Sequence, residues 1–325
     1  MLTGVRAENI IAFGPVPSRR LGRSLGINNI PAKTCTYSCI YCQLGRTAET
    51  CNKRRRFYEP ELIFRQVKEK IEQSRAAGES IDYLAFVPDG EPTLDVNLGQ
   101  EIEMLKPLGF KIAVLTNASL IGDAEVESDL ATADLVSLKI DAVSEDVWRQ
   151  VNRPHRSLDL HSLLEGIREF ARDFKGQVIS ETMLIDGVND RHEEIRNLGK
   201  YLSNLRLSKA YVAIPTRPPA ENWIRAASDY TINLAYQTLS GLLGSNKVEF
   251  LIRYEGDAFT STGNIEEDLL SITSVHPMRR EAMVGVLRKA NADWRLVEKL
   301  IRDGKLIQIS YEGHDFYMRK LPSRK

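Results

Sequence analysis

The sequence predicts an α/β fold, a parallel sheet covered by helices, followed by a small C-terminal module of a different kind. Between residues 24 and 243, short apolar segments alternate with longer amphipathic ones about six times. This is the pattern of parallel strands joined by crossover helices. After residue 276, two amphipathic helices and two short alternating strands follow one another instead. We therefore expect a main domain over residues 1–262 and a module over 263–325.

The strand-and-helix units follow in order along the chain. Strands are expected at 24–30, 83–87, 111–116, 134–140, 177–185 and 209–216. Helices are expected at 59–78, 96–107, 123–131, in stretches up to about 172, and at 191–204 and 229–243. By pattern alone a closed eight-unit barrel and an open doubly wound sheet both remain possible, although six units are few for the closed barrel.

The tail is expected to form a winged-helix module. Helical spacing covers residues 279–290 and, after the possible cap Asn291, continues to 302. Two alternating segments at 306–311 and 315–320 then read as a hairpin. Helix, helix and hairpin in this order are typical of a winged helix.

The formal net charge of the chain is zero. Lys and Arg total 44, as do Asp and Glu, so any nucleic-acid binding must use a local patch. We find no signal-peptide pattern and no apolar run of about 20 residues, and expect a cytoplasmic protein that does not enter a membrane. Four cysteines within 17 positions of such a chain indicate metal binding or catalysis more than disulfides.

Three of these cysteines, Cys35, Cys39 and Cys42, have the spacing C-x3-C-x2-C, and Cys51 follows alone. A zinc site needs four ligands, and Cys51 would have to complete the set. Three thiolates on a [4Fe-4S] cluster instead leave one iron open to a small molecule. In that case Cys51 is either a small buried side chain or a thiol near the substrate. The loop follows the first expected strand, so it lies at the carboxyl edge of the sheet.

This loop, with Tyr41 before the third cysteine, resembles the C-x3-C-x-aromatic-C motif of radical S-adenosylmethionine (SAM) enzymes, and the resemblance extends over about residues 10–255. It implies a partial (β/α)6 barrel in which Cys35, Cys39 and Cys42 bind a [4Fe-4S] cluster. SAM would chelate the fourth iron and be cleaved to a 5'-deoxyadenosyl radical that abstracts a substrate hydrogen. An external electron donor such as flavodoxin or ferredoxin would reduce the cluster.

The resemblance also implies which side chains contact SAM. After the second strand, Gly90 and Glu91 match the end of the family's Gly-Gly-Glu element, whose first glycine is replaced here by Asp89. Gly90 would let a backbone approach closely. After the third strand, Asn117 borders SAM, unless it only caps the next helix.

The fourth and fifth strands supply the remaining SAM candidates. Ser137, Lys139 and Asp141 recur at period two and therefore share one face. They are expected to bind SAM, with an internal Lys139–Asp141 ion pair as the alternative. Met183 on the fifth strand is a further candidate, as are the loops 186–190 and 214–219.

The segments around the cysteines look most like a branch grouped with the wyosine-base synthases of transfer RNA, although no cysteine precedes Cys35. The substrate is therefore open and includes tRNA or a protein. Basic groups that favour RNA flank the loop on both sides: Arg19, Arg20, Arg23, Lys53, Arg54, Arg55 and Arg56. The alternative is a metal- or cluster-containing nucleic-acid-binding or sensory protein that acts through its winged helix.

Overall fold

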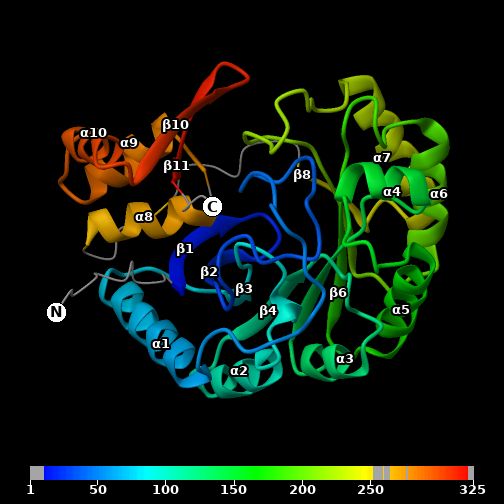
Figure 1. Ribbon diagram of the computed structural model, residues 1–325, viewed down its shortest axis with the longest axis horizontal. Helices are drawn as coiled ribbons and strands as arrows, with labels where there is room; N and C mark the ends of the chain where they lie inside the picture. Colours follow the sequence, from blue (N-terminus) through cyan, green and yellow to red (C-terminus); the bar gives the residue numbers. More distant parts are fainter. Residues whose placement is uncertain (1–10, 252–258, 260–263, 276, 321–325) are drawn as a thin grey trace.

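The computed structural model describes residues 11–251, 259, 264–275 and 277–320. Its main sheet has eight strands in the order β1 to β8, with β1 antiparallel to β2 and all later pairs parallel. The strands are β1 Ala12–Ser18, β2 Gly22–Ile27, β3 Tyr83–Phe86, β4 Lys111–Thr116, β5 Leu135–Lys139, β6 Gln177–Met183, β7 Lys209–Ala213 and β8 Val248–Leu251. The sheet curls into a half-barrel, so the α/β prediction is confirmed (Figure 1).

Helices cover the outer face of this sheet (Figure 1). They are α1 Pro60–Ala76, α2 Leu98–Leu105, α3 Ala124–Leu130, α4 Glu145–Asn152, α5 Leu160–Asp173, α6 His192–Ser203 and α7 Asp229–Leu243. Their apolar faces and the outward side chains of the strands form a large buried cluster and a smaller one that contains the buried face of α7. The alternation of apolar strands and amphipathic helices arises from this two-layer packing.

Two strands of the sheet were not expected. The β1 segment contains Pro15 and Pro17. Proline lacks the N–H group that a central strand needs, so it occurs at sheet edges. Strand β1 does lie at an edge of the sheet, next to β2. At the other edge, β8 is only four residues long. Both strands extend the six expected parallel strands, β2 to β7, without changing their order.

The C-terminal module packs mainly against β1 and also contacts the outer helix α1. It contains α8 Ile265–Val275, β9 Met278–Arg279, α9 Arg280–Lys289, α10 Arg295–Arg302, β10 Leu306–Tyr311 and β11 His314–Arg319. Its three-stranded sheet has the order β10-β11-β9. Phe13 and Val16 of β1 share a buried cluster with this module, and a buried ion pair joins Lys70 of α1 to Asp268 of α8 at 2.9 Å.

Helix α8 and strand β9 were missed in the sequence. The expected boundary between residues 262 and 263 lies outside the described residues. Within the described part of the chain, the structure contains no helix that is both long and apolar enough to cross a bilayer.

Candidate active site

The cysteine loop follows β2 and is held on one side by the segment after β3. The backbone N–H of Lys33 donates to the carbonyl of Asp89 at 2.7 Å, and that of Glu91 donates to the carbonyl of Thr34 at 3.0 Å. Gly90 lies between these two bonds, and a Cβ atom there would stand 1.8 Å from the Thr34 carbonyl oxygen. The predicted close approach at Gly90 is therefore present, and the approaching backbone belongs to the cysteine loop.

On its other side the loop is held by the end of α4. Ser38 N–H donates to the carbonyl of Asn152 at 3.0 Å, and Ile40 N–H donates to that of Val151 at 2.9 Å. Trp148 Nε1 also donates to the Tyr37 hydroxyl at 3.2 Å. The loop is thus clamped between two elements that are far apart in the sequence, which fixes the positions of its cysteines.

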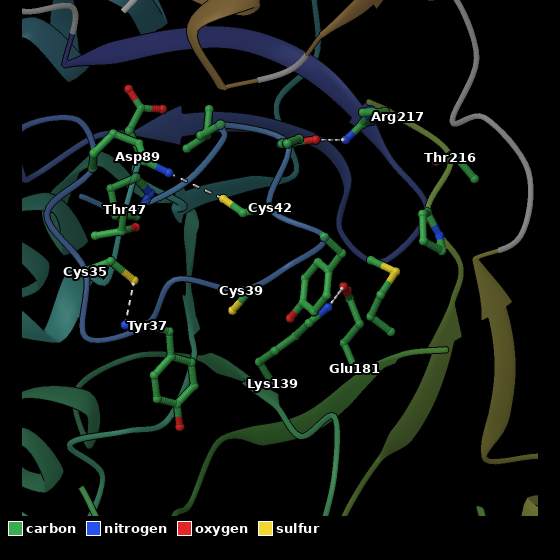
Figure 2. Close-up of a pocket in the computed structure, with 18 of the residues that line it drawn as sticks. Cys35, Tyr37, Cys39, Cys42, Thr47, Asp89, Lys139, Glu181, Thr216 and Arg217 are labelled. Atoms are coloured by element: carbon green, nitrogen blue, oxygen red, sulfur yellow. Dashed lines mark hydrogen bonds and ion pairs between the residues drawn. The ribbon is translucent and has the colours of Figure 1, made fainter. Parts of the chain in front are cut away.

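All three cysteines of the motif line one cavity of about 310 Å³, a size typical of ligand sites. Figure 2 shows Cys35, Cys39 and Cys42 along one wall and Lys139, Glu181, Thr216 and Arg217 farther along the hollow. Among the described residues, no three His, Cys, Asp or Glu side chains converge as a single metal ion would require. Cys51, the proposed fourth zinc ligand, is not among the residues that line this cavity.

Each cysteine sulfur accepts a hydrogen bond from one nitrogen-bearing side chain. Asn117 Nδ2 lies 3.6 Å from Cys35 Sγ, Asn152 Nδ2 lies 3.4 Å from Cys39 Sγ, and Lys33 Nζ lies 3.8 Å from Cys42 Sγ. The backbone N–H of Tyr37 also points to Cys35 Sγ at 3.5 Å (Figure 2). These donors suit sulfur atoms that carry negative charge.

Without a metal, the environments of Cys35 and Cys39 favour the neutral thiols. Burial, followed by the nearby Asp141 carboxylate, raises the pKa of Cys39 to about 12. Burial and the neighbouring Cys39 raise the pKa of Cys35 as well. Deprotonation of both thiols therefore requires strong positive charge from a bound metal group, so three cysteines around one cavity fit a cluster with one iron left open.

Lys139 on β5 crosses the cavity to β6. Its Nζ donates to Glu181 Oε1 at 2.7 Å and stands 5.0 Å from the centre of the Tyr41 ring. Arg20 reaches Glu181 from the turn between β1 and β2 and completes a partly buried cluster of two cations and one carboxylate. The alternative of an internal Lys139–Asp141 ion pair is wrong, because Glu181 lies directly across from Lys139 in the β5–β6 register. Burial lowers the pKa of Lys139, and the Arg20 charge adds to this effect.

Asp141 instead holds the cysteine loop. Its carboxylate accepts hydrogen bonds from the Tyr41 hydroxyl, from Asn152 Nδ2 at 2.8 Å and from the backbone N–H of Met183 at 2.8 Å. Asp141 is not among the residues that line the cysteine cavity, whereas Met183 is. The expectation that Asp141 shares the cavity-facing side with Lys139 is therefore wrong, because β5 ends at Lys139 and the chain turns after it.

A second cavity of about 260 Å³ adjoins the first and shares Cys35, Cys39 and Gly90 with it. Ser137 and Asn117 line this second cavity. The helix-cap alternative for Asn117 is wrong, because Asp123 caps α3 by accepting from Glu125 N–H at 2.9 Å.

Glu91 is buried and also lines the second cavity. Its carboxylate accepts from the hydroxyls of Thr93 and Thr116 at 2.7 and 2.6 Å and from the backbone N–H groups of Thr93 and Asn117 at 3.1 and 2.7 Å. Burial raises the pKa of Glu91, and these hydrogen bonds oppose the rise. Its side chain therefore ties the segment after β3 to the end of β4.

Several cations expected to form an RNA-binding rim are used inside the protein. Arg54 is largely buried and pairs with Asp129 and Glu125. Arg23 pairs with Glu79 at the amino ends of the strands, and Arg20 lies in the cavity. Of the expected run after the cysteines, Lys53, Arg55 and Arg56 remain exposed.

The sequence did not mark Lys33 or Asn152 as site residues, and it placed Arg20 only in the RNA-binding rim. Nothing in the local pattern marks Asn152, the last residue of an amphipathic helix, which reaches Cys39 across 113 positions. Loop 214–217 does line the cysteine cavity as expected, while Asn189 in loop 186–190 binds the carbonyls of Asp141 and Met183, each at 2.8 Å.

Comparisons with known proteins agree with this site. A sequence model described as the Radical SAM superfamily matches residues 29–199. UPF0026 protein MJ1312 of Methanocaldococcus jannaschii is 46% identical over 314 residues, which cover 97% of each chain. The fold is similar to that of a radical SAM methyltransferase from Sphaerobacter thermophilus, with a TM-score of 0.53 at 19% identity over 71% of this chain and 66% of that one. It is also similar to TYW1 with a lysine-pyruvate adduct bound, with a TM-score of 0.50 at 18% identity over 67% and 73% of the two chains.

Proposed function

Because this chain belongs to the radical SAM superfamily, whose enzymes use a [4Fe-4S] cluster and SAM, we propose that Cys35, Cys39 and Cys42 hold the cluster. The chain is thus a radical SAM enzyme. The observation that carries the ligand assignment is the single cavity lined by all three thiols, each with its own N–H donor. Cys51 has no part in it.

When bound, the cluster and SAM would together supply the radical chemistry that removes a hydrogen atom from the substrate. The protein positions the reactants and excludes water. The clamps on both sides of the cysteine loop hold the three sulfurs in place, and the cavity leaves room beside them for SAM.

The residues that we propose for the SAM site are Gly90, Glu91, Asn117, Ser137, Lys139 and Met183, with Asp141 as a supporting residue outside the cavity wall. Gly90, Lys139 and Met183 line the cysteine cavity, and Asn117 and Ser137 line the adjoining one. The ammonium group of Lys139 is suited to bind the carboxylate of SAM. This carboxylate would compete with that of Glu181 for the hydrogen bonds of Lys139. Glu91 and Asp141 act by holding neighbouring backbone segments in position.

The direct test is anaerobic reconstitution with iron and sulfide. We expect about four irons and four sulfides per chain, and after reduction the slow release of 5'-deoxyadenosine from SAM. Cys39→Ala should lose the cluster, whereas the matched variant Cys51→Ser should keep it. Stoichiometric zinc without iron in protein purified under anoxia, or loss of the cluster in Cys51→Ser, would refute the assignment.

A second test addresses SAM. Lys139→Met should weaken SAM binding at least tenfold while the iron content stays at the wild-type value, because the variant removes a cation from the cavity wall and leaves the cysteines intact. The control is Lys209→Met. Lys209 lies on β7 and pairs with Glu249 of β8, and neither residue lines the cysteine cavity. Unchanged SAM affinity in Lys139→Met would make the lysine a structural partner of Glu181 alone.

We propose that the substrate is a macromolecule, with tRNA the first candidate. The support is the exposed group Lys53, Arg55 and Arg56 next to the cysteine loop. Counterion release predicts that tRNA binding at ~50 mM salt falls steeply as salt rises. Neutralising Arg55 and Arg56 should reduce both the affinity and the slope of log affinity against log salt. Arg54 must be left intact, because it donates to the carbonyls of Thr93 and Asp95 and so anchors its segment to the one after β3. A wild-type slope would favour a protein or small-molecule substrate.

We propose further that the C-terminal module is a winged helix and that an external donor such as flavodoxin or ferredoxin reduces the cluster. The module has α9 and α10 followed by the hairpin β10–β11, with β11 also paired to β9. Lys299 and Lys305 both pair with Glu266 of α8. Since these cations are already used within the module, we favour a role in substrate contact over DNA reading.

A further inference from the structure

Three separate parts of the chain each send one N–H donor to one cysteine of the motif. Lys33 comes from the start of the cysteine loop, Asn117 from the turn after β4, and Asn152 from the last position of α4. One side-chain N–H donor for each sulfur, with no such donor shared between sulfurs, suggests a function beyond packing.

Lys33 is held in a conformation that is unfavourable for a residue with a side chain. Its φ is 64°, in the left-handed region that costs non-glycine residues about 1 kcal/mol or more. Its backbone N–H is bound to Asp89, and its ammonium contacts both Cys42 Sγ and the carbonyl of Gly45. The loop therefore directs a full positive charge to one sulfur.

The amide of Asn152 is equally constrained. The residue is 2% exposed, and its Nδ2 divides its two hydrogens between Cys39 Sγ and the carboxylate of Asp141. The carboxylate orients the amide so that the nitrogen, not the oxygen, points to the sulfur.

Asn117 is fixed in the same way. Its Oδ1 accepts from Ser119 N–H at 2.9 Å, and its Nδ2 also donates to Thr36 Oγ1 at 2.8 Å. In Asn117 the amide oxygen accepts a hydrogen bond, and in Asn152 both amide hydrogens are donated, so neither amide can flip without losing a hydrogen bond.

We propose that Lys33, Asn117 and Asn152 set the reduction potential of the cluster. This inference rests on the proposed cysteine ligands. A reduced cluster carries one more negative charge than the oxidised cluster, so N–H donors to its thiolates stabilise the reduced state more strongly, and they do so most where water is excluded. Lys33 should have the largest effect because it brings a net charge.

The test is a redox titration of the reconstituted cluster, followed by electron paramagnetic resonance. Lys33→Met should shift the one-electron reduction equilibrium about tenfold toward the oxidised form, which corresponds to about 59 mV. Lys33→Gln, which keeps a neutral donor, should shift it less. Lys53→Met removes an exposed lysine near the same loop and should leave the potential unchanged.

Asn152→Leu should lower the potential in the same direction by a smaller amount. If this variant fails to fold, Lys33→Met still decides, because its substitution leaves the backbone bonds of the loop in place. Wild-type potential in a fully loaded Lys33→Met protein, or an equal shift in Lys53→Met, would overturn the inference. Failure of the wild-type protein itself to bind iron would instead overturn the proposed ligand set.

Discussion

The segment that follows β3 contains two buried carboxyl sites with opposite surroundings. Glu91 is 1% exposed and accepts four hydrogen bonds, from Thr93 twice, Thr116 and Asn117. Ten positions later, Glu101 is equally buried and faces another carboxyl group, that of Asp95. Asn29 Nδ2 reaches Glu101 Oε2 at 3.3 Å, while Glu101 Oε1 and Asp95 Oδ2 are buried without a donor.

The difference shows how donors decide the state of a buried acid. Burial raises the pKa at both sites. At Glu91 the hydrogen bonds favour the charged form. At Glu101 the neighbouring Asp95 adds to the effect of burial and raises the pKa to about 9. The donors around Glu91 therefore favour its charged form. The Glu101–Asp95 pair instead favours a proton shared between the two carboxyl groups.

The largest effect is expected for Glu91→Gln. The amide places N–H groups where the carboxylate accepted hydrogen bonds, so at least one buried donor loses its partner. We expect a loss of about 3 kcal/mol in the free energy of unfolding of the apoprotein, measured by urea denaturation. Glu103→Gln on the exposed face of α2, paired only with Lys106 at the surface, should change it by less than ~0.5 kcal/mol. Equal small losses in both variants would remove the contrast.

An intermediate effect is expected for the Glu101 pair, and it depends on pH. The folded protein keeps a proton on Glu101 up to about pH 9, whereas the ordinary pKa of the side chain is 4.5. Since the unfolded chain releases this proton first, the free energy of unfolding should fall as pH rises from about 4.5 toward about 9, by up to ~1.4 kcal/mol per pH unit.

Glu101→Gln supplies a permanent N–H donor and removes this titration. Its free energy of unfolding should therefore depend less on pH over the same range and exceed that of the wild type above neutral pH. Urea denaturation at pH 6, 7 and 8, approximately the middle of that range, measures the difference. A variant with the wild-type slope would show that the two carboxyl groups do not share a proton.

The smallest effect is expected for Thr93→Val, which removes one of the four donors to Glu91 while keeping the shape of the side chain. We expect a loss of about 1 kcal/mol in the free energy of unfolding, because three donors remain. A loss as large as that of Glu91→Gln would mean that the four bonds form only as a set.

Much of the fold followed from periodicity. The six strands β2 to β7 and the hairpin β10–β11 were predicted within a few residues, because a strand buried on both faces and an alternating hairpin each have a local signature. Strand β1, with two prolines, and β8, with four residues, have no such signature. Helix α8 was missed although it forms the contact between the module and β1.

In the site, spacing alone was enough to single out Cys35, Cys39 and Cys42, because chelation requires ligands from one short loop. The alternative considered for Lys139, an ion pair with Asp141, is wrong, because its partner is Glu181. Strand register decides which side chains face each other across a sheet, and register is not visible in one strand's own sequence.

The sequence by itself determined the α/β architecture, the cysteine loop at the carboxyl edge of the sheet and the family. These depend on residue patterns within about 20 positions, because the geometry of a helix or strand decides which nearby side chains share a face. The tertiary structure alone decided which N–H donor meets each sulfur, that Arg54 is an anchor, and which buried acid keeps its proton. Each of these outcomes depends on side chains from distant segments, brought together and removed from water only when the sheet and its helices have packed.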